Sequence, residues 1–398
     1  MSTPSQVEPV QTGWQETFLG EVVNRVDTSG PDSTLDSFTY VDLSSVDAVC
    51  KRIAAPREVS TAEAPSRARQ RVSAQDVLVS TVRPNLNGVA MVPDDLDGSI
   101  ASTGFCVLRS KRDELDPRYL FHWVRSDFFV SAMVRRTTGA SYPAVSDSIV
   151  KGSSIPLPPH PEQRRIADIL DRADDLRAKR RRVLAYLDEL EGSVFSSMFG
   201  DVTRNVHGFA VIPFADLGRL DRGVSRARPR NSPRLLGGNH PLVQTGEVAG
   251  SEGYIRTFTQ TYSDEGLAQS RMWPAGTLAI TIAANIAKTG VLTFSACFPD
   301  SVVGFTPEPS KTNVEYIRFW LRSLQATLER QAPASAQKNI NLSILRELQV
   351  PVPPVVVQDQ FASNIASIQL LKAEQRGHLT KLDELFASLQ HRAFSGEL

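Results

Sequence analysis

The densest basic segment of this 398-residue chain runs from residue 219 to residue 234. It contains six arginines and a single acid, Asp221, and glycine and proline interrupt it repeatedly, which is typical of a loop. A guanidinium group binds phosphate oxygens, and it can also donate two parallel hydrogen bonds to the edge of a guanine base. We therefore predict that this loop contacts nucleic acid rather than solvent alone. The predicted contact residues are Arg219, Arg222, Arg226, Arg228, Arg230 and Arg234.

A shorter basic segment in the first half of the chain is a second candidate for such contacts. Three alternating arginines precede a strand-like run at residues 77–82, and an Arg-Pro-Asn turn follows that run. Further polar groups lie before two proline clusters; Gln and Asn can pair with adenine, but such residues also cap helices and turns. The candidates in the first half are Arg67, Arg69, Arg71, Arg83, Asn85, Tyr142 and Ser146. Those in the second half are Gln337, Lys338, Asn339 and Asn341.

The sequence carries none of the motifs that would give the chain a reaction of its own. It has no N-P-P-[FYW] or D-P-P-[FYW] motif of adenine methylases and no G-x-x-x-x-G-K-[ST] phosphate loop. The nearest approach to a nuclease motif is Asp300 with Glu308 and Lys311, but the last two residues are wrongly spaced and a proline separates them. The six histidines and three cysteines are scattered, without the spacing of a zinc site. We therefore predict a non-catalytic chain without a metal or cofactor.

Composition places the chain among globular proteins with more than one domain. Hydrophobic residues make up 41% and charged residues 22%, and the length exceeds that of one ordinary domain. The N-terminus is polar and no apolar run approaches membrane-spanning length, so we expect a cytoplasmic protein. The net charge is zero, yet residues 202–349 hold 16 basic against 11 acidic side chains, whereas residues 1–154 hold 16 against 19. Any contact with DNA is therefore expected to be local.

The chain contains an internal duplication. Residues 155–199 align without a gap on residues 350–394, with 15 of 45 positions identical, including three prolines and an Asp-Glu-Leu run. A second match lies upstream, where YLFHWVRS at 119–126 parallels YIRFWLRS at 316–323. Self-similarity of this kind defines the architecture before any local motif does. The order is domain, helix, domain, helix.

Each repeated segment opens with a proline cluster and then continues for nearly forty residues without proline, which predicts a helix near 57 Å long. Apolar residues recur at steps of three and four, and Arg180 and Gln375 interrupt both copies at the same repeat position. The alternative is two ordinary amphipathic helices, each covering its own domain; the shared spacing favours an antiparallel pair between the domains. The predicted packing residues are Ile166, Ile169, Leu176, Val183, Leu187, Leu190, Phe361, Ile368, Leu371, Leu382, Leu385 and Leu389.

The segments outside the helices are predicted to form α+β domains. Both contain short β-rich runs, many turn residues and one helix near the end, but their sequences have diverged strongly. We divide the chain into an N-terminal domain (1–154), a central helical region (155–201), a second domain (202–349) and a C-terminal helical region (350–398). A duplicated scaffold with diverged domains indicates one task performed on two different targets.

The segments IPLPPHPEQRRIADIL and VPVPPVVVQDQFASNI, with the helices that follow them, closely resemble the conserved regions of the DNA specificity subunits of type I restriction-modification systems. The second copy keeps Gln358 but has Val357 where the first has Glu162. The resemblance extends over essentially the whole chain, because the flanking segments match the order and size of the two target recognition domains of that family.

This resemblance implies a non-catalytic reader of double-stranded DNA. Each recognition domain would bind one half of a bipartite target, and the helices would set the gap and dock two methylation subunits, to which restriction subunits bind. The S-adenosylmethionine and ATP sites of the family lie on those partner subunits. Two alternatives remain open at this point: a fused restriction-methylation polypeptide, and a coiled-coil scaffold that binds only proteins. A methylation assay on the isolated chain would test the first, and salt-dependent retention on DNA the second.

Overall fold

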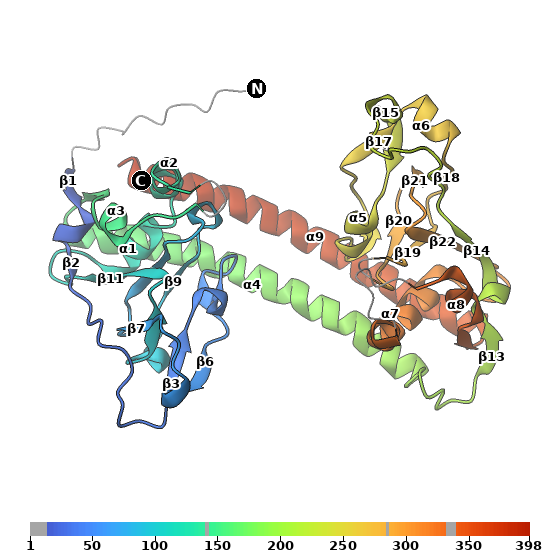
Figure 1. Ribbon diagram of the computed structural model, residues 1–398, viewed down its shortest axis with the longest axis horizontal. Coiled ribbons are helices and arrows are strands. Elements are labelled where there is room, and N and C mark those ends of the chain that lie inside the picture. The colour runs from blue at the N-terminus through green and yellow to red at the C-terminus, as the bar shows by residue number, and fades with distance from the viewer. Residues whose placement is uncertain (1–13, 140–142, 284–285, 332–339) are drawn as a thin grey trace. The chain divides into compact units, whose positions relative to one another are not determined.

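The computed structural model describes residues 14–139, 143–283, 286–331 and 340–398 (Figure 1). The chain divides into two compact units, residues 1–182 with 376–398, and residues 183–375. Each unit combines one α+β domain with parts of two long helices, α4 (His160–Phe199) and α9 (Val355–Phe394). The predicted order of domain, helix, domain, helix is confirmed. Among the described residues, none of the helices offers an apolar stretch long enough to cross a membrane.

Two four-stranded sheets build the first domain, in the orders β6-β3-β10-β7 and β2-β11-β8-β9. Its strands are β1 (Gln15–Phe18), β2 (Val23–Asn24), β3 (Ser37–Val41), β4 (Val46–Asp47), β5 (Arg52–Ile53), β6 (Arg57–Ser60), β7 (Ala68–Arg71), β8 (Val77–Ser80), β9 (Val89–Met91), β10 (Ile100–Ser102), β11 (Phe105–Ser110) and β12 (Ser154–Leu157). Its helices are α1 (Pro117–Trp123), α2 (Asp127–Arg135) and α3 (Asp147–Lys151).

The second domain has sheets in the orders β17-β15-β21-β18 and β14-β22-β19-β20-β16. Its strands are β13 (Ala210–Pro213), β14 (Gly218–Arg222), β15 (Leu236–Leu242), β16 (Gly253–Ile255), β17 (Gln260–Tyr262), β18 (Met272–Trp273), β19 (Leu278–Thr281), β20 (Thr289–Leu292), β21 (Ala296–Cys297), β22 (Val302–Pro307) and β23 (Gln349–Val352). Its helices are α5 (Thr245–Ala249), α6 (Asp264–Ala268), α7 (Val314–Gln331) and α8 (Leu342–Glu347).

The two domains share one strand topology although their sequences have diverged. In each, a mixed sheet contains one parallel pair, β3·β10 in the first domain and β15·β21 in the second, flanked by antiparallel strands. The second sheet follows the same antiparallel order, with β2-β11-β8-β9 matching β14-β22-β19-β20. A short ribbon of β1 with β12, or of β13 with β23, joins the start of each domain to the strand before its long helix. The duplication therefore includes the domains.

The glutamine shared by both repeated motifs fixes the start of each long helix. The Gln163 side chain accepts a hydrogen bond from the backbone N–H of Asp116 at 2.8 Å, and it donates to a carbonyl of the proline cluster at 2.9 Å. Gln358 makes the matching bonds, with the N–H of Asn313 at 3.2 Å and the second proline cluster at 2.8 Å. Both glutamines are buried. Each motif thus joins the proline cluster, the long helix and the beginning of α1 or α7.

The two long helices run antiparallel within each unit. In the first unit, Arg165 reaches the backbone of Leu398, and Arg177 pairs with Asp383. In the second unit, Glu191 accepts hydrogen bonds from Gln369 and Lys372. Each helix also supplies apolar side chains to both domain cores, so the predictions of a helix pair and of domain-covering helices each hold in part.

The predicted narrow seam needs correction. Of the predicted packing residues, Ile166, Phe361 and Ile368 are buried, Ile169, Leu187, Leu382 and Leu389 are half-buried, and Leu176, Val183, Leu190, Leu371 and Leu385 are exposed. The buried side chains of the two helices instead include Leu170, Phe195 and Phe386. Each helix packs against a domain as well as against the other helix, so its buried face is wider than a single heptad stripe.

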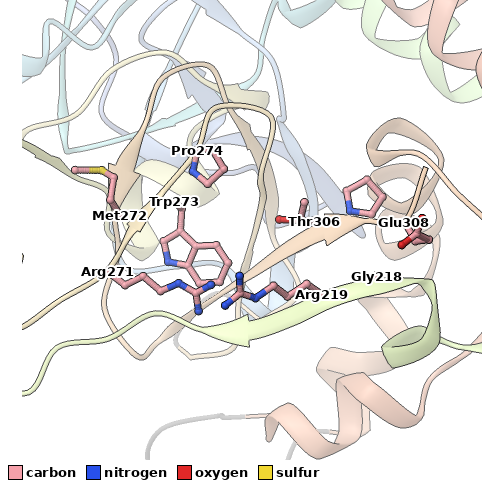
Figure 2. A pocket seen from close by; sticks show the side chains of 9 residues that line it. Gly218, Arg219, Arg271, Met272, Trp273, Pro274, Thr306 and Glu308 are labelled. Carbon is pink, nitrogen blue, oxygen red and sulfur yellow. The ribbon is translucent and has the colours of Figure 1, made fainter. Parts of the chain in front are cut away.

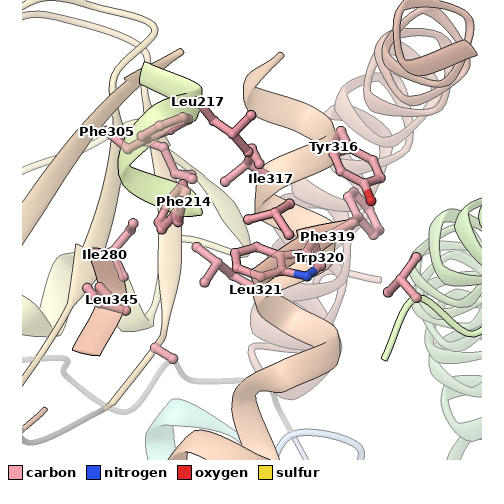
Figure 3. Packing of buried hydrophobic residues seen from close by; sticks show 14 of the residues in the cluster. Phe214, Leu217, Ile280, Phe305, Tyr316, Ile317, Phe319, Trp320, Leu321 and Leu345 are labelled. Atoms are coloured by element: carbon pink, nitrogen blue, oxygen red, sulfur yellow. The ribbon is translucent and has the colours of Figure 1, made fainter. Parts of the chain in front are cut away.

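An aromatic cluster forms the core of the second unit where α7 meets the sheet and the long helices. Trp320 of α7 lies edge-on to Phe214 at 5.5 Å between ring centroids (Figure 3). Phe319 meets Phe361 of α9 at 5.0 Å. Phe199 of α4 joins the same cluster. Burial of this aromatic surface fixes the sheets of the second domain relative to its parts of α4 and α9.

Candidate nucleic-acid interface

Three arginines surround one carboxylate on strand β14. Arg219 Nε donates to Asp221 Oδ2 at 2.9 Å, and Arg271 Nη1 donates to the same oxygen at 3.2 Å. Arg346 of α8 lies 3.8 Å from the other oxygen and donates to the carbonyl of Leu220. The hydrogen bond from Arg219 is the main cause that lowers the pKa of Asp221, so this carboxylate stays ionised. We call these four charged residues the Asp221 cluster.

Two members of the Asp221 cluster, Arg219 and Arg271, line a cavity of about 610 Å³ between β14, β18 and the end of β22. Its lining residues are Gly218, Arg219, Arg271, Met272, Trp273, Pro274, Thr306, Pro307 and Glu308. Figure 2 shows the guanidinium groups of Arg219 and Arg271 turned toward one another, with Glu308 at the far end. The Arg271 guanidinium lies 4.1 Å from the centre of the Trp273 ring, which holds it by a cation–π contact.

The rest of the predicted arginine loop divides into paired and unpaired side chains. Arg230 forms an ion pair with Asp300 at 2.8 Å, and Arg228 lies 3.8 Å from the same carboxylate. Arg234 pairs separately with Glu265 at 3.3 Å. Arg222 and Arg226 are exposed, and no carboxylate of the described residues lies within ion-pair distance of them. This segment is a strand at 218–222 followed by a loop, and not a loop throughout.

The first-domain candidates lie in two separate places, at β7 and in the turn after β8. Arg69 and Arg71 alternate with buried residues along β7, and Arg67 directly precedes that strand beside a cavity of about 430 Å³. Arg83 and Asn85 are exposed in the turn after β8, where Arg83 adopts a left-handed backbone conformation. The structure therefore places these five residues on the domain surface without joining them in one cluster.

Four predicted residues lie outside the described part of the chain. These are Tyr142, Gln337, Lys338 and Asn339. The described neighbours of the first are close to the Arg83 turn, because the Arg83 N–H donates to the carbonyl of Pro143 and Val82 bridges to Ala144. The contact of these four residues with DNA stays a prediction.

Sequence reasoning missed Arg271 and Arg346. Arg271 is fifty residues from Asp221, and Arg346 is more than a hundred residues away, so neither belongs to a basic run. Each stands alone among neutral or acidic neighbours. Only the packing of β18 on β22, where the Trp273 ring lies against Gly304, and the position of α8 bring them to Asp221. Within the described residues, no group of three His, Cys, Asp or Glu side chains could hold a metal ion.

A second surface feature is an apolar stripe along one side of α4. Leu176, Val183, Tyr186 and Leu190 follow one another at helical spacing, and all four side chains are exposed. Exposed apolar residues that repeat along one helix face are typical of a protein-binding surface. We call these four residues the α4 stripe.

Comparison with known proteins identifies a family of DNA specificity domains. Residues 73–185 and 209–375 match the family described as type I restriction modification DNA specificity domain, so the match occurs twice and covers most of the chain. The HindI specificity subunit of Haemophilus influenzae is 21% identical over 192 residues, which are 47% of this chain and 41% of that protein. The chain therefore spans less than half the length of this relative. The putative MjaX specificity subunit of Methanocaldococcus jannaschii is 18% identical over 83% of this chain and 80% of its own length.

Solved structures extend the similarity to the whole chain. A chain in a structure that describes complex assembly and conformational transition of the type I R-M system is 26% identical, with a TM-score of 0.57 over 99% of this chain and 100% of that chain. The S subunit of a type I system from M. genitalium has the same TM-score at 13% identity over 98% of both chains, which shows the fold alone. With two family matches on a duplicated α+β and long-helix architecture, this chain belongs to the DNA specificity subunits of type I restriction-modification systems.

Proposed function

We propose that each α+β domain of this chain reads one half of a bipartite DNA target. The observation that carries this proposal is the shared strand topology of two domains whose surface arginines differ. A common scaffold presents Arg69 and Arg71 from β7 in one domain and the Asp221 cluster beside β18 in the other. Because base choice depends on a few side chains held on such a scaffold, two diverged copies are suited to two different half-sites.

The long helices are proposed to set the gap between the half-sites and to dock two methylation subunits, through which restriction subunits join. The α4 stripe supports docking, since it exposes four apolar side chains, one of them a tyrosine, that neither domain core uses. Tyrosine and aliphatic side chains of this kind are common in the buried centre of protein interfaces. A solved chain of similar architecture comes from a study of type I complex assembly.

The chain is proposed to have no reaction of its own and to act in the cytoplasm. S-adenosylmethionine and ATP are expected to bind the methylation and restriction subunits. The carboxylate of the nearest nuclease-like motif, Asp300, supports this view because it is engaged by Arg230 and Arg228. A catalytic metal site would need carboxylates left available to the ion.

Exchange of one domain tests the proposal of independent half-site reading. Residues 202–349 would be replaced by the matching segment of a relative with another target, and the modified adenines would be mapped in the presence of the methylation subunit. We expect one half of the target to change and the other half to stay the same. Alteration of both halves would contradict independent reading.

A further inference from the structure

We propose that Arg219 and Arg271, held side by side by Asp221, form a binding site for a phosphate group of the DNA backbone in the second domain. The inference rests on the proposed DNA-reading function and deepens it by naming a site and its ligand chemistry. The sequence predicts Arg219 as a contact residue, whereas Arg271 is brought to it only by the fold.

Contacts on two sides position Arg271. Arg271 is held on one side by the Asp221 carboxylate at 3.2 Å and on the other by the face of Trp273 at 4.1 Å. Trp273 is 1% exposed, and it stacks on Phe298 at 4.9 Å between ring centroids. A side chain at Gly304 would lie 2.5 Å from the Trp273 ring, so the indole has no room to shift. The Arg271 guanidinium is therefore placed before any ligand arrives, which reduces the entropy cost of binding.

The charge of the site favours an anion. Three guanidinium groups meet one carboxylate, and the lowered pKa of Asp221 keeps that carboxylate ionised, so the cluster carries an excess of two positive charges. Among the residues that line the cavity, Glu308 is an acid, and it lies at the opposite end from the guanidinium groups (Figure 2). It accepts a hydrogen bond from the Ser310 hydroxyl at 3.3 Å. An anion would therefore bind at the arginine end.

The shape of the site suits one phosphate and its sugar. The cavity of about 610 Å³ is far too small for a duplex, but it can accept a group that projects from one. Two guanidinium groups can donate to different oxygens of one phosphate, a stronger arrangement than a single contact. The side chain of Arg219 is 65% exposed, so a ligand on the surface can reach it.

The duplicated topology gives independent support. Strand β18 occupies in the second domain the sheet position that β7 occupies in the first. In each sheet it is the antiparallel neighbour of the later strand of the parallel pair, which is β10 for β7 and β21 for β18. Arg271 directly precedes β18, and the predicted contacts Arg69 and Arg71 lie on β7. Both domains therefore present arginine from the same place in the fold.

Salt-dependent binding of the full chain to a fluorescent duplex of mixed sequence tests the site. The variants are Arg219→Met, Arg271→Met and the double variant, and the control is Arg204→Met, which removes an exposed charge from the same unit. Each phosphate contact contributes about 0.9 to the slope of log affinity against log salt, or about 3.5-fold between about 50 and 200 mM. We expect roughly tenfold weaker binding at the lower salt and a slope reduced by about two for the double variant. Arg204→Met should match the wild type.

The other outcomes of this experiment distinguish an error in the proposed function from an error in the phosphate site. If the wild type fails to bind DNA, the proposed function is wrong; if it binds and the double variant matches it, only the phosphate site is wrong. A loss confined to one base position of the target would assign Arg271 to a base edge and overturn the backbone assignment. Titration with inorganic phosphate in the absence of DNA tests whether the site binds a free anion instead of a DNA phosphate. Binding of free phosphate that the double variant loses, with DNA binding unchanged, would make the site one for a free anion. Arg219→Met alters an exposed side chain, so its result stands even if Arg271→Met disturbs folding.

Discussion

Lys372 forms an ion pair with Asp188 in the second unit, and the internal repeat maps this pair onto Arg177 and Asp383 in the first. In each pair the basic residue comes from one long helix and the acid from the other, with the roles of α4 and α9 exchanged. The surroundings differ: Arg177 lies over the ring of Phe386 at 4.3 Å, whereas Lys372 pairs with Glu191, which occupies the repeat position of Phe386. The same helix contact is thus stabilised by different chemistry in the two units.

Removing the basic residue should cost more stability in the second unit than in the first. Lys372 and Glu191 are almost completely buried, whereas Asp383 is 43% exposed. Lys372→Met leaves a buried carboxylate without its cation, so we expect the free energy of unfolding to fall by about 3 kcal/mol. Arg177→Met should cost about 1 kcal/mol, because water can solvate Asp383. Urea unfolding of both variants measures the difference, and equal losses would contradict the role assigned to burial.

A second substitution tests whether the buried charge is the cause. Glu191→Leu added to Lys372→Met removes the unpaired carboxylate, so most of the lost stability should return. If the double variant is as unstable as Lys372→Met alone, lost packing and not lost charge balance explains the effect.

The buried glutamine at the start of each long helix should be essential to its unit. Gln358 accepts from the hydroxyl of Thr312 at 2.8 Å and from the N–H of Asn313, and it donates to two carbonyl groups. Gln358→Leu leaves these buried groups without partners, so we expect a loss of about 3 kcal/mol in the free energy of unfolding. Gln360→Leu, two residues away on the exposed side of α9, is the matched control and should change stability little. Similar losses for both variants would show that the hydrogen bonds of Gln358 are not what stabilises the unit.

The first unit should lose stability as the pH falls below about 6.5. Burial is the largest cause that lowers the pKa of His122, with Arg125 adding to it, while a hydrogen bond with Asp171 at 2.7 Å opposes the shift. The unfolded chain therefore binds a proton on His122 at a pH where the folded chain does not, and protonation favours unfolding. Phe319 occupies the repeat position of His122. His122→Phe should weaken the dependence of stability on pH between about 7 and 5, above the range in which carboxylates titrate.

Two results would contradict the assignment of this pH dependence to His122. A wild-type chain with constant stability over that range, or a His122→Phe variant with the same pH dependence as the wild type, would mean that His122 does not take part.

The repeat allowed the sequence to predict the order of domains and helices, but periodicity alone could not identify the buried helix face. The helices begin at His160 and Val355, close to the proline clusters that predict them. Leu176 and Leu371 fit a heptad pattern yet are exposed, because the domain that each helix covers selects another face, on which Leu170 and Ile365 are buried. The Asp221 cluster was beyond sequence reasoning for a related reason. A basic run is visible in a sequence, whereas an arginine such as Arg271 gains its neighbours only when one sheet packs against the other.

Lengthening both long helices by one heptad tests whether they set the half-site gap. The insertions belong between residues 182 and 183 and between residues 375 and 376, where each helix passes from one unit to the other. There they leave the ion pairs of Arg177 and Lys372 intact. Seven residues add about 10.5 Å, near three base pairs, so the preferred gap should grow by that amount. Affinity should fall even at the best gap, because three base pairs also rotate one half-site about the duplex.

Insertion into a single helix is the control for the double insertion. It should shift the helices against each other and reduce folding or partner docking instead of changing the gap. A double insertion that retains the original gap at full efficiency would show that the helices do not determine spacing.

Mapping of methylated adenines in a methylation-free host tests the central claim most directly. The host would express the methylation subunit of the same system with and without this chain, and every modified adenine in its genome would be located. We predict a split motif, two short specific sequences separated by a gap of fixed length, that is modified only when this chain is present. Modification that does not depend on the chain, or a single uninterrupted motif, would contradict the account of two domains that each read half of a bipartite target.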